Sequence, residues 1–593
     1  MSTAATTATA PKATPTSEAT TEPVNEVRVP TEKPPYHWVN ERTRKIMDRG
    51  YLVGDTSPEE RVRDIGERAE ALLRKTGPGG EEVAEGFADR FERFAAKGFY
   101  SLASPVWSNF GMDRGLPISC FGSYIGDSVE SILETHAEVG TMTKMGGGTA
   151  VYFGDVRPRG ARISNQGKTA GTHPFAQLFD KEIQVISQGN VRRGHCAGYV
   201  DIEHGDIEEW LRIQREGDEI QDMMWGVCVG DDWMEAMIRG DRKKREVWAA
   251  VLKNRMEIGV PYIIFRGNAQ RGRPDCYKRG GYRIKGSNLC SEIMLPQGPK
   301  ESFVCCLSSM NLAEWPRWKD TRAVETLTQL LDAVLTEFIE EADGTKFMER
   351  PVRFAKRHRA IGIGALGWHS FLQSKRIPFD SWEANRLNAE IFKTIRERSY
   401  QESRRLGRLM GPAEVCSENG PEGRRHTTTM AVAPTKSSSV ILGQVSPSVE
   451  PHKSNYYVRD AAKLKFSVKN PHLREVLSSR GRDTEETWDS IREADGSVQH
   501  LDFLSEREKE VFKTFAEIPQ LAVVQQAAQR QKFIDQSQSI NLAINSGEAD
   551  PKEINRLYIR AWKLGVKSLY YQKNVNAAQT AGRKMMTCQA CEG

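Results

Sequence analysis

The segment Asn288-Leu289-Cys290-Ser291-Glu292 decides most about this chain. Side chains at alternate positions of an extended segment project from one face, so Asn288, Cys290 and Glu292 are expected to share one small site. A thiol beside a hydrogen-bonding amide and a potential general base can carry out chemistry that a structural cysteine does not need. The pattern is short, and its alternative is an ordinary strand or loop in which the free cysteine packs as a small buried hydrophobe.

Length and composition set the class of protein. The chain has 593 residues, which indicates several modules or one large α/β barrel with insertions. No apolar run approaches the roughly 18 residues that span a bilayer, and no stripe of basic and aromatic residues indicates nucleic-acid binding. The formal net charge of +5 is close to balance. Ten cysteines without a secretory segment predict a reducing, cytoplasmic setting in which any disulfide is transient and catalytic.

Composition divides the chain into four parts. Residues 1–35 are rich in Ala, Thr, Pro, Ser and Glu and are expected to be disordered, although a transit peptide is the alternative. Residues 36–118 have the pattern of a helical region, because charged, Ala-rich segments are broken there by Gly and Pro. Short β-prone stretches then alternate with long amphipathic ones over residues 119–575, which predicts an α/β fold. Residues 576–593 form a flexible tail.

Two polar stretches interrupt this alternation. Residues 407–426 and 478–500 are expected to be surface excursions. The pair Arg424-Arg425 is expected to lie on a solvated face or loop.

The chain ends Thr587-Cys588-Gln589-Ala590-Cys591-Glu592-Gly593. A zinc site would need a second pair of ligands, and none closely precedes this one. Two thiols in a flexible tail can instead form and break a disulfide, and so carry reducing equivalents from a thioredoxin-like donor into a site that the donor cannot enter. This redox interpretation of Cys588 and Cys591 is favoured over a structural or metal-binding one.

Upstream of this tail lies the adjacent pair Tyr570-Tyr571. Such a pair is commonly made of strand or interface residues. Phenol side chains can nonetheless carry proton-coupled one-electron transfer, and an interior thiol such as Cys290 needs a route by which it is oxidised.

Together these features strongly resemble the large, catalytic subunit of class I ribonucleotide reductase, from about Ser101 to the end of the chain. The further motifs that carry the resemblance are Ser104-Pro105 near Ser108-Asn109-Phe110-Gly111, Pro117-Ile118-Ser119-Cys120-Phe121, Cys305-Cys306-Leu307-Ser308-Ser309-Met310-Asn311-Leu312 and Pro434-Thr435-Lys436-Ser437-Ser438-Ser439. The resemblance implies a ten-stranded α/β barrel of two five-stranded parallel halves set antiparallel, with a finger loop around 288–292.

The resemblance also implies the radical chemistry. Cys290 would be the thiyl radical that abstracts the ribose 3′ hydrogen, and Glu292 would accept the proton of the 3′ hydroxyl. Asn288 would hydrogen-bond the sugar and Glu292. Tyr570 and Tyr571 would relay the radical to Cys290.

The remaining cysteines receive redox or structural roles. Cys120 and Cys305 would supply two electrons and become a disulfide, for which their Cα atoms must lie within roughly 7 Å. Cys306 is adjacent, but Cys305 keeps the family spacing to Asn311-Leu312, and Cys306 points the other way if the segment is extended. Cys588 and Cys591 would re-reduce the pair. The cysteines that match no family motif are read as structural: Cys196, Cys228, Cys276 and Cys416.

Substrate and effector contacts follow from family positions. The substrate set is Ser104, Ser119, Cys120, Asn288, Leu289, Cys290, Glu292, Pro434, Thr435, Lys436, Ser437 and Ser438, of which the run from Pro434 could open a helix that binds phosphate. The effector candidates are Asp127, Arg157 and Arg162. Ser164 stands where many relatives place an effector-contacting arginine, so either Arg162 substitutes for it or the contact is absent.

The resemblance finally implies partners and leaves alternatives. A metal-containing small subunit would generate the radical, the large subunit would form a homodimer, a thioredoxin- or glutaredoxin-like protein would reduce the tail, and dNTP or ATP would act as effectors. No metal or other cofactor is expected in this chain, and the helical region is too short for an N-terminal ATP cone. The alternatives are an adenosylcobalamin-dependent reductase, a glycyl-radical enzyme and a non-catalytic nucleotide-binding paralogue, of which the tyrosine pair disfavours the first.

Overall fold

The computed structural model describes Met1 and residues 33–164, 167–188, 192–420, 423–461, 464–545 and 550–574. The chain separates into two units, Met1–Pro34 and Pro35–Gly593, and the helices and strands belong to the second. Most of the predicted N-terminal tail and all of the redox tail with Cys588 and Cys591 lie outside the described residues. Among the described residues, no helix is long and apolar enough to cross a membrane.

Five parallel strands form one half of the central sheet. Their spatial order is β2 (Cys120–Tyr124), β3 (Gly148–Tyr152), β6 (His195–Asp201), β7 (Met224–Val229) and β8 (Tyr262–Phe265). Helices α6 (Val129–Lys144), α7 (Thr172–Val185), α9 (Asp231–Arg239) and α10 (Arg242–Ile258) connect them. Every residue of β7 and β8 is buried, as expected for parallel strands that are covered on both faces.

The second half begins at β9 (Phe303–Asn311), which is antiparallel to β2 and parallel to β10 (Ile361–Leu366). Parallel bridges join Ile363 to Met430 and Val432 to Gln538, so residues 429–432 and 537–539 continue the ladder. After residues 537–539, β13 (Leu542–Ile544) is parallel to β15 (Gln572–Asn574), and β14 (Ser568–Leu569) pairs antiparallel with β8. With the five strands of the first half, these stretches confirm the predicted ten-stranded α/β barrel, and β1 (Tyr100–Leu102) adds to β9.

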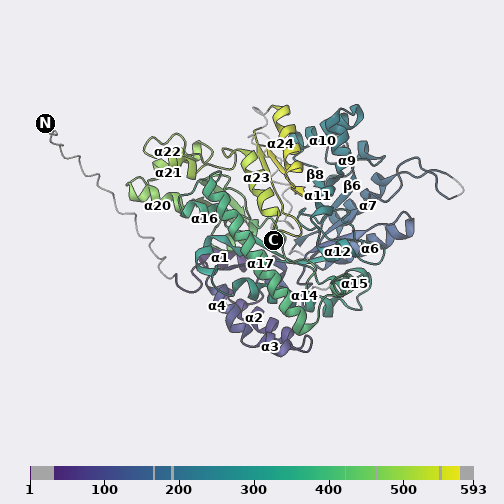
Figure 1. Cartoon of the computed structure of the whole chain (residues 1–593), viewed down its shortest axis with the longest axis horizontal. Helices are drawn as coiled ribbons and strands as arrows, with labels where there is room; N and C mark the ends of the chain where they lie inside the picture. The colour runs from purple at the N-terminus through teal and green to yellow at the C-terminus, as the bar shows by residue number, and fades with distance from the viewer. Residues whose placement is uncertain are drawn as a thin grey trace. The chain divides into compact units, whose positions relative to one another are not determined.

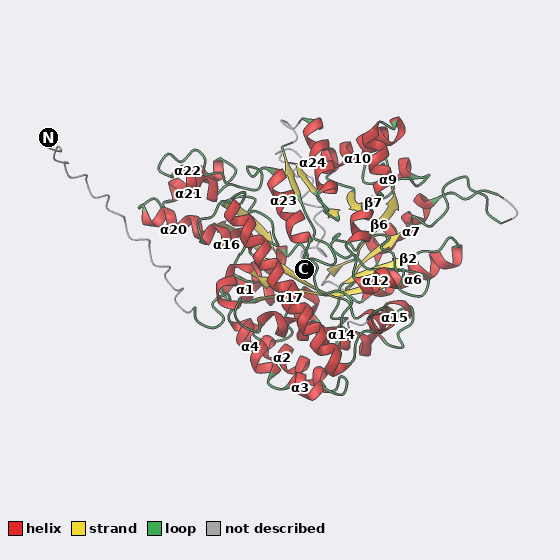
Figure 2. Cartoon of the chain, viewed as in Figure 1, coloured by secondary structure: helices red, strands yellow, loops and turns green. Residues whose placement is uncertain are grey.

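Long helices enclose the strands (Figure 2). Helix α14 (Ala323–Ala342) is buried along most of its length, since apolar residues occupy all of its faces. It lies beside α17 (Trp382–Met410) and packs on α2 (Pro58–Arg74) and α4 (Phe87–Ala96) of the N-terminal region (Figure 1). Ser57 and Glu60 form a capping box that begins α2, with Pro58 in the first turn.

The remaining helices are shorter. They are α1 (Glu41–Met47), α3 (Gly80–Ala84), α5 (Ser104–Ser108), α8 (Ile207–Trp210), α11 (Arg266–Arg271), α12 (Asp275–Arg279), α13 (Trp315–Trp318), α15 (Glu349–His358), α16 (Trp368–Ser374), α18 (Glu414–Glu418), α19 (Lys436–Ile441), α23 (Gln520–Gln531) and α24 (Pro551–Lys563). Two further antiparallel strand pairs are β4 (Ser187–Gln188) with β5 (Arg192–Arg193), and β11 (Tyr456–Ala461) with β12 (Leu464–Lys469).

Most of residues 478–500 are exposed, as expected of a surface excursion, but the expectation is wrong for Trp488, Ile491 and Val498, which are buried. Helices α20 (Pro471–Ser479), α21 (Glu485–Glu493) and α22 (Glu506–Val511) enclose a second hydrophobic cluster. Trp488 and Ile491, three positions apart on α21, are fully buried in it. The stretch looks polar because this small core needs only a few apolar residues at helical spacing.

The expectation for Arg424-Arg425 is also wrong, because both side chains are buried. Arg425 forms an ion pair with Asp332 on α14, which also bonds Arg359 and His426. These cations hold the pKa of the Asp332 carboxyl well below its ordinary value although burial opposes them. Arg425 is buried because it pairs with the carboxylate of Asp332, 93 positions away in the sequence. Local composition cannot predict such a distant partner.

Candidate active site

The finger segment folds as a tight turn at Leu289 and Cys290, so the expectation of an extended segment is wrong. Ser291 adopts a φ of 68°, in the left-handed region that few non-glycine residues occupy. Its backbone N–H donates to the Asn288 carbonyl at 3.3 Å. The turn still brings the ends of the motif together, because Asn288 Nδ2 donates to Glu292 Oε1 at 2.9 Å.

Glu292 lies in an environment that suits proton transfer. Burial raises the pKa of Glu292 to about 7, although hydrogen bonds from Asn288 and Ser539 favour its charged form. Ser539 Oγ lies 3.0 Å from Glu292 Oε2 and also contacts the backbone oxygen of Cys290, so its one O–H is shared between these two acceptors. A carboxyl with this pKa can take up and release a proton near neutral pH.

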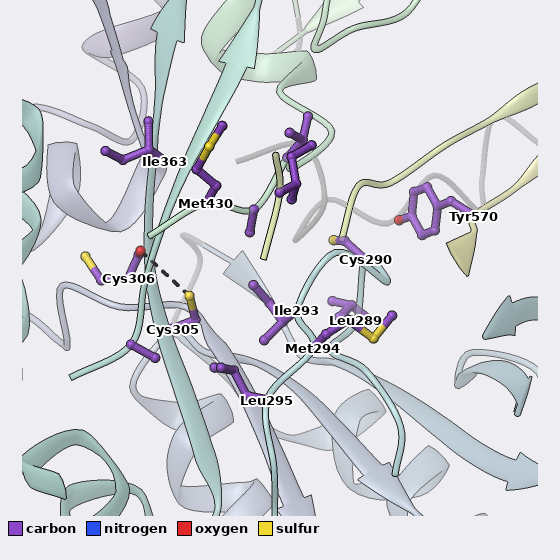
Figure 3. Close-up of a cluster of buried hydrophobic side chains, with 14 of the residues drawn as sticks. Leu289, Cys290, Ile293, Met294, Leu295, Cys305, Cys306, Ile363, Met430 and Tyr570 are labelled. Atoms are coloured by element: carbon purple, nitrogen blue, oxygen red, sulfur yellow. Dashed lines mark hydrogen bonds between the residues drawn. The ribbon is translucent and has the colours of Figure 1, made fainter. Parts of the chain in front are cut away.

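The thiols of Cys120 and Cys305 lie on neighbouring strands. The two residues are direct partners in the antiparallel register of β2 and β9, and both are free thiols. Directly opposed residues in such a pair have Cα atoms about 4.5 to 5.5 Å apart, which a disulfide can bridge. Cys306 instead pairs with Ile361 of β10, and its side chain points away from that of Cys305 (Figure 3).

Most of the predicted substrate-binding residues line one pocket. Its lining includes Ser119, Cys120, Cys290, Glu292, Cys305, Pro434, Thr435 and Ser438, together with Ser308 and Ser309 of β9. The three central thiols and the carboxylate therefore face one pocket. Other predicted substrate residues lie around it without being among its lining residues, namely Ser104, Asn288, Leu289, Lys436 and Ser437. Ser104 bonds Tyr51, and its neighbours Ala103 and Pro105 reach the pocket.

Residues 535–539, called the backing segment below, form hydrogen bonds with Glu292, Met294 and Cys305. The Ser537 N–H donates to the Glu292 carbonyl at 2.8 Å. Gln536 Nε2 donates to Cys305 Sγ at 3.3 Å, and Gln536 Oε1 accepts from the Met294 N–H at 3.2 Å. Sequence reasoning missed this segment, because no spacing links it to the motif that it supports.

The tyrosine pair belongs to a cluster of three rings. The centroids of Tyr570 and Tyr571 are 4.3 Å apart, and Tyr262 of β8 lies 4.7 Å from Tyr570 and 5.1 Å from Tyr571. Figure 3 shows the Tyr570 hydroxyl directed toward Cys290. Tyr571 is less buried and donates to the Met224 sulfur at 3.2 Å. Tyr262 was not predicted, since a single tyrosine in an apolar strand has no distinguishing pattern.

The three predicted effector residues also meet. Arg157 Nε pairs with Asp127 Oδ2 at 2.8 Å, and Arg157 Nη1 donates to the backbone oxygen of Arg162 at 2.6 Å. Asp127 lies directly before Ser128, the N-cap of α6. The charged side chains of this group are partly exposed at the surface.

Comparison with known proteins agrees with this geometry. The family described as the ribonucleotide reductase barrel domain matches residues 118–244, 238–420 and 414–572. A related protein of Frog virus 3 is 37% identical, over 89% of this chain and 96% of its own length. The ribonucleoside-diphosphate reductase large subunit of Invertebrate iridescent virus 3 is 33% identical, over 93% of this chain and 97% of that protein. The class Id ribonucleotide reductase alpha subunit of Actinobacillus ureae superposes with a TM-score of 0.86 at 53% identity, over 93% of this chain and 99% of that one.

Proposed function

Because the chain belongs to the ribonucleotide reductase family, we propose that it is the large subunit of a class I enzyme that reduces ribonucleoside diphosphates to 2′-deoxyribonucleotides. The observation that carries this proposal is the arrangement of Cys290, Glu292, Cys120 and Cys305 around one pocket. In this proposal a hydrogen-abstracting thiol, a base and a dithiol reductant act together on one bound sugar.

Each residue has a defined step in the proposed reaction. The Cys290 thiyl radical takes the ribose 3′ hydrogen, and Glu292 takes the proton of the 3′ hydroxyl. Cys120 and Cys305 then lose two electrons and two protons to the substrate and form one disulfide, while the 2′ hydroxyl leaves as water. The balance is one ribonucleotide and two thiols giving one deoxyribonucleotide, one disulfide and one water.

The radical is proposed to reach Cys290 through Tyr571 and Tyr570 from a metal-containing small subunit. The close contact of the two rings supports this order, since Tyr571 is the more exposed of the two and the Tyr570 hydroxyl is directed toward Cys290. This chain would supply the relay and the substrate site. The small subunit would supply the metal chemistry.

Substrate and effector binding are proposed for two separate places. Pro434, Thr435 and Ser438 line the pocket and would contact the substrate phosphates, with Lys436 and Ser437 beside them. A nucleotide effector would bind at Asp127, Arg157 and Arg162, where a phosphate can compete for the arginine.

A homodimer is proposed to form over α6 and α7, next to these effector residues. Val129 and Leu133 of α6 are 56% and 54% exposed, and Leu178 and Val185 of α7 are 41% and 71% exposed. Apolar side chains on adjacent helices form a surface that a second copy can bury. The effector would then bind close to the subunit boundary.

The redox tail is proposed to re-reduce the Cys120–Cys305 disulfide through Cys588 and Cys591. Cys588→Ser should then spare a single turnover when thioredoxin is the only reductant, and a small dithiol should restore cycling. Normal multiple turnover of this variant with thioredoxin alone would contradict the shuttle role.

The decisive experiment measures conversion of CDP to dCDP by the purified chain with dithiothreitol and an effector. A class I small subunit is added in one arm and adenosylcobalamin in the other. Activity with the small subunit alone supports the proposal. Activity with the cobalamin alone assigns the chain to the cofactor-dependent class, and inactivity with a cognate small subunit indicates a non-catalytic paralogue.

A further inference from the structure

Gln536 is fully buried, and both ends of its amide are engaged within the site. Its Nε2 lies 3.3 Å from Cys305 Sγ, 3.0 Å from Thr428 Oγ1 and 3.1 Å from the Ile361 carbonyl, so these three acceptors share its two N–H groups. Its Oε1 accepts from the Met294 N–H at 3.2 Å. One side chain therefore joins strand β9, which carries Cys305, to the loop that carries Cys290 and Glu292.

The surroundings fix the orientation of this amide. A flipped amide would place its NH₂ group against the Met294 N–H and its oxygen against the Ile361 carbonyl, so both contacts would be lost. The backbone of Gln536 is held as firmly, because its N–H donates to the Met430 carbonyl at 3.2 Å. Its carbonyl accepts from Lys567 Nζ at 2.7 Å and from Gln531 Nε2 at 3.0 Å. The N–H group that reaches Cys305 is thus pre-organised.

We propose that Gln536 is a positioning residue for the reductant thiol: its amide N–H holds the Cys305 sulfur opposite Cys120 and stabilises it in the reduced form. The inference rests on the proposed function, in which Cys120 and Cys305 are the reducing pair. It adds a residue that no motif of the chain identifies, and it gives the pair a means of setting its redox equilibrium.

The physical reason is the change at sulfur during the reaction. When the pair is oxidised, both S–H bonds break, one S–S bond forms, and two electrons and two protons pass to the substrate as water leaves. The sulfur of a thiol or thiolate carries more negative charge than a disulfide sulfur, and it therefore accepts a hydrogen bond better. Burial raises the pKa of Cys305 well above its ordinary value, whereas the Gln536 hydrogen bond lowers it. The bond therefore favours the dithiol.

The test measures the equilibrium between the Cys120–Cys305 dithiol and its disulfide in the full-length chain. The chain is equilibrated with reduced and oxidised dithiothreitol, and the two cysteines are mapped by differential alkylation and mass spectrometry. Q536M keeps the side-chain volume and removes the donor. It should shift the equilibrium toward the disulfide by about fivefold, the factor expected for one net hydrogen bond.

Q538M is the matched control. Gln538 is also fully buried and lies two positions away, but its amide donates to the Ala527 carbonyl at 2.7 Å and to Gln531 Oε1 at 3.2 Å. The equilibrium in Q538M should equal that of the unmodified chain. Equal shifts in Q536M and Q538M, or no shift in either, would overturn the inference.

Q536E supplies a pH signature that a structural defect would not give. The introduced carboxyl can donate its O–H to the Cys305 sulfur only while it is protonated, and it loses that donor when it ionises. The equilibrium constant for disulfide formation in Q536E, divided by that of the unmodified chain, should therefore rise with pH. A ratio that stays constant with pH would contradict the inference. If the unmodified chain itself forms no Cys120–Cys305 disulfide under oxidising conditions, the proposed function fails instead.

Discussion

The finger segment 288–292 and the backing segment 535–539 make the same site in different ways. The finger contains two of the groups proposed to react, Cys290 and Glu292, within five residues. The backing segment contains none of these groups, yet it donates hydrogen bonds to Glu292 through Ser537 and Ser539. Reactivity is thus local in sequence, whereas the positions and proton affinities of the reacting groups depend on residues about 240 positions away.

The largest effect is expected in the finger, at Cys290. Cys290→Ser replaces the thiol with a hydroxyl whose O–H bond a thiol-based relay cannot use, so even a single turnover should be lost. Activity should fall below about 10⁻⁴ of the unmodified chain, as when a reacting side chain of other enzymes is removed. The measurement is single-turnover dCDP formation with the small subunit, with nucleotide binding as the control. A measurable first turnover would exclude Cys290 as the hydrogen-abstracting thiol.

A smaller loss is expected when only the base of the finger is removed. Glu292→Gln keeps the shape and one acceptor oxygen for either Asn288 or Ser539, but it cannot take up a proton at neutral pH. General-base catalysis typically contributes about 10² to 10⁴ in rate, so kcat should fall within that range. The pH profile should also lose its inflection near pH 7. Retention of that inflection would assign it to another group.

The backing segment should tune the finger without abolishing its chemistry. Ser539→Ala removes a hydrogen bond that favours ionised Glu292, so its pKa, about 7 in the unmodified chain, should rise. A hydrogen bond to a charged group contributes about 1.5 kcal/mol, equivalent to about one pH unit. Since the base must be ionised, activity relative to the unmodified chain should fall about eightfold at pH 6.5 and recover by about pH 9.

Ser537→Ala is the control for this profile. Ser537 reaches Glu292 through its backbone N–H, while its hydroxyl bonds Ser568. Its substitution should leave the profile unshifted. A Ser539→Ala profile that is lowered equally at all pH values would indicate a structural role for Ser539.

The same contrast explains what the sequence could predict of the fold. Strands β7 and β8 of the first half coincide with apolar runs around Val227 and Ile263, and such runs are typical of buried parallel strands. The strand of the second half at 537–539 is part of a polar run that resembles a loop, Asp535-Gln536-Ser537-Gln538-Ser539. Its side chains are buried because each finds a partner inside the barrel, and hydrophobic periodicity does not report such partners.

Within the site, the sequence indicated reacting residues better than their surroundings. The finger motif, the paired thiols and the tyrosine pair were recognisable as motifs. The turn at Ser291 was not recognisable, because a positive φ is usually indicated by glycine and this position is a serine. Tyr262, Gln536 and Ser539 were missed for a related reason, since their contacts to the site join distant parts of the chain.

The smallest effect on activity is expected at Cys306, which is adjacent to Cys305 in sequence but faces away from the pocket. If contact with the backing segment rather than sequence position defines the reductant, Cys306→Ala should change kcat less than about twofold, because surroundings outside the pocket contribute little to the chemistry. Burial raises the pKa of Cys306, so its thiol stays neutral and packs as a small apolar group. Its removal should cost about 1 kcal/mol of unfolding free energy, measured by denaturant titration.

Cys305→Ala is the matched comparison on the same strand and should stop dCDP formation. Equal activities of the two variants would contradict the proposal that Cys305, which contacts Gln536, is the reductant and Cys306 is not.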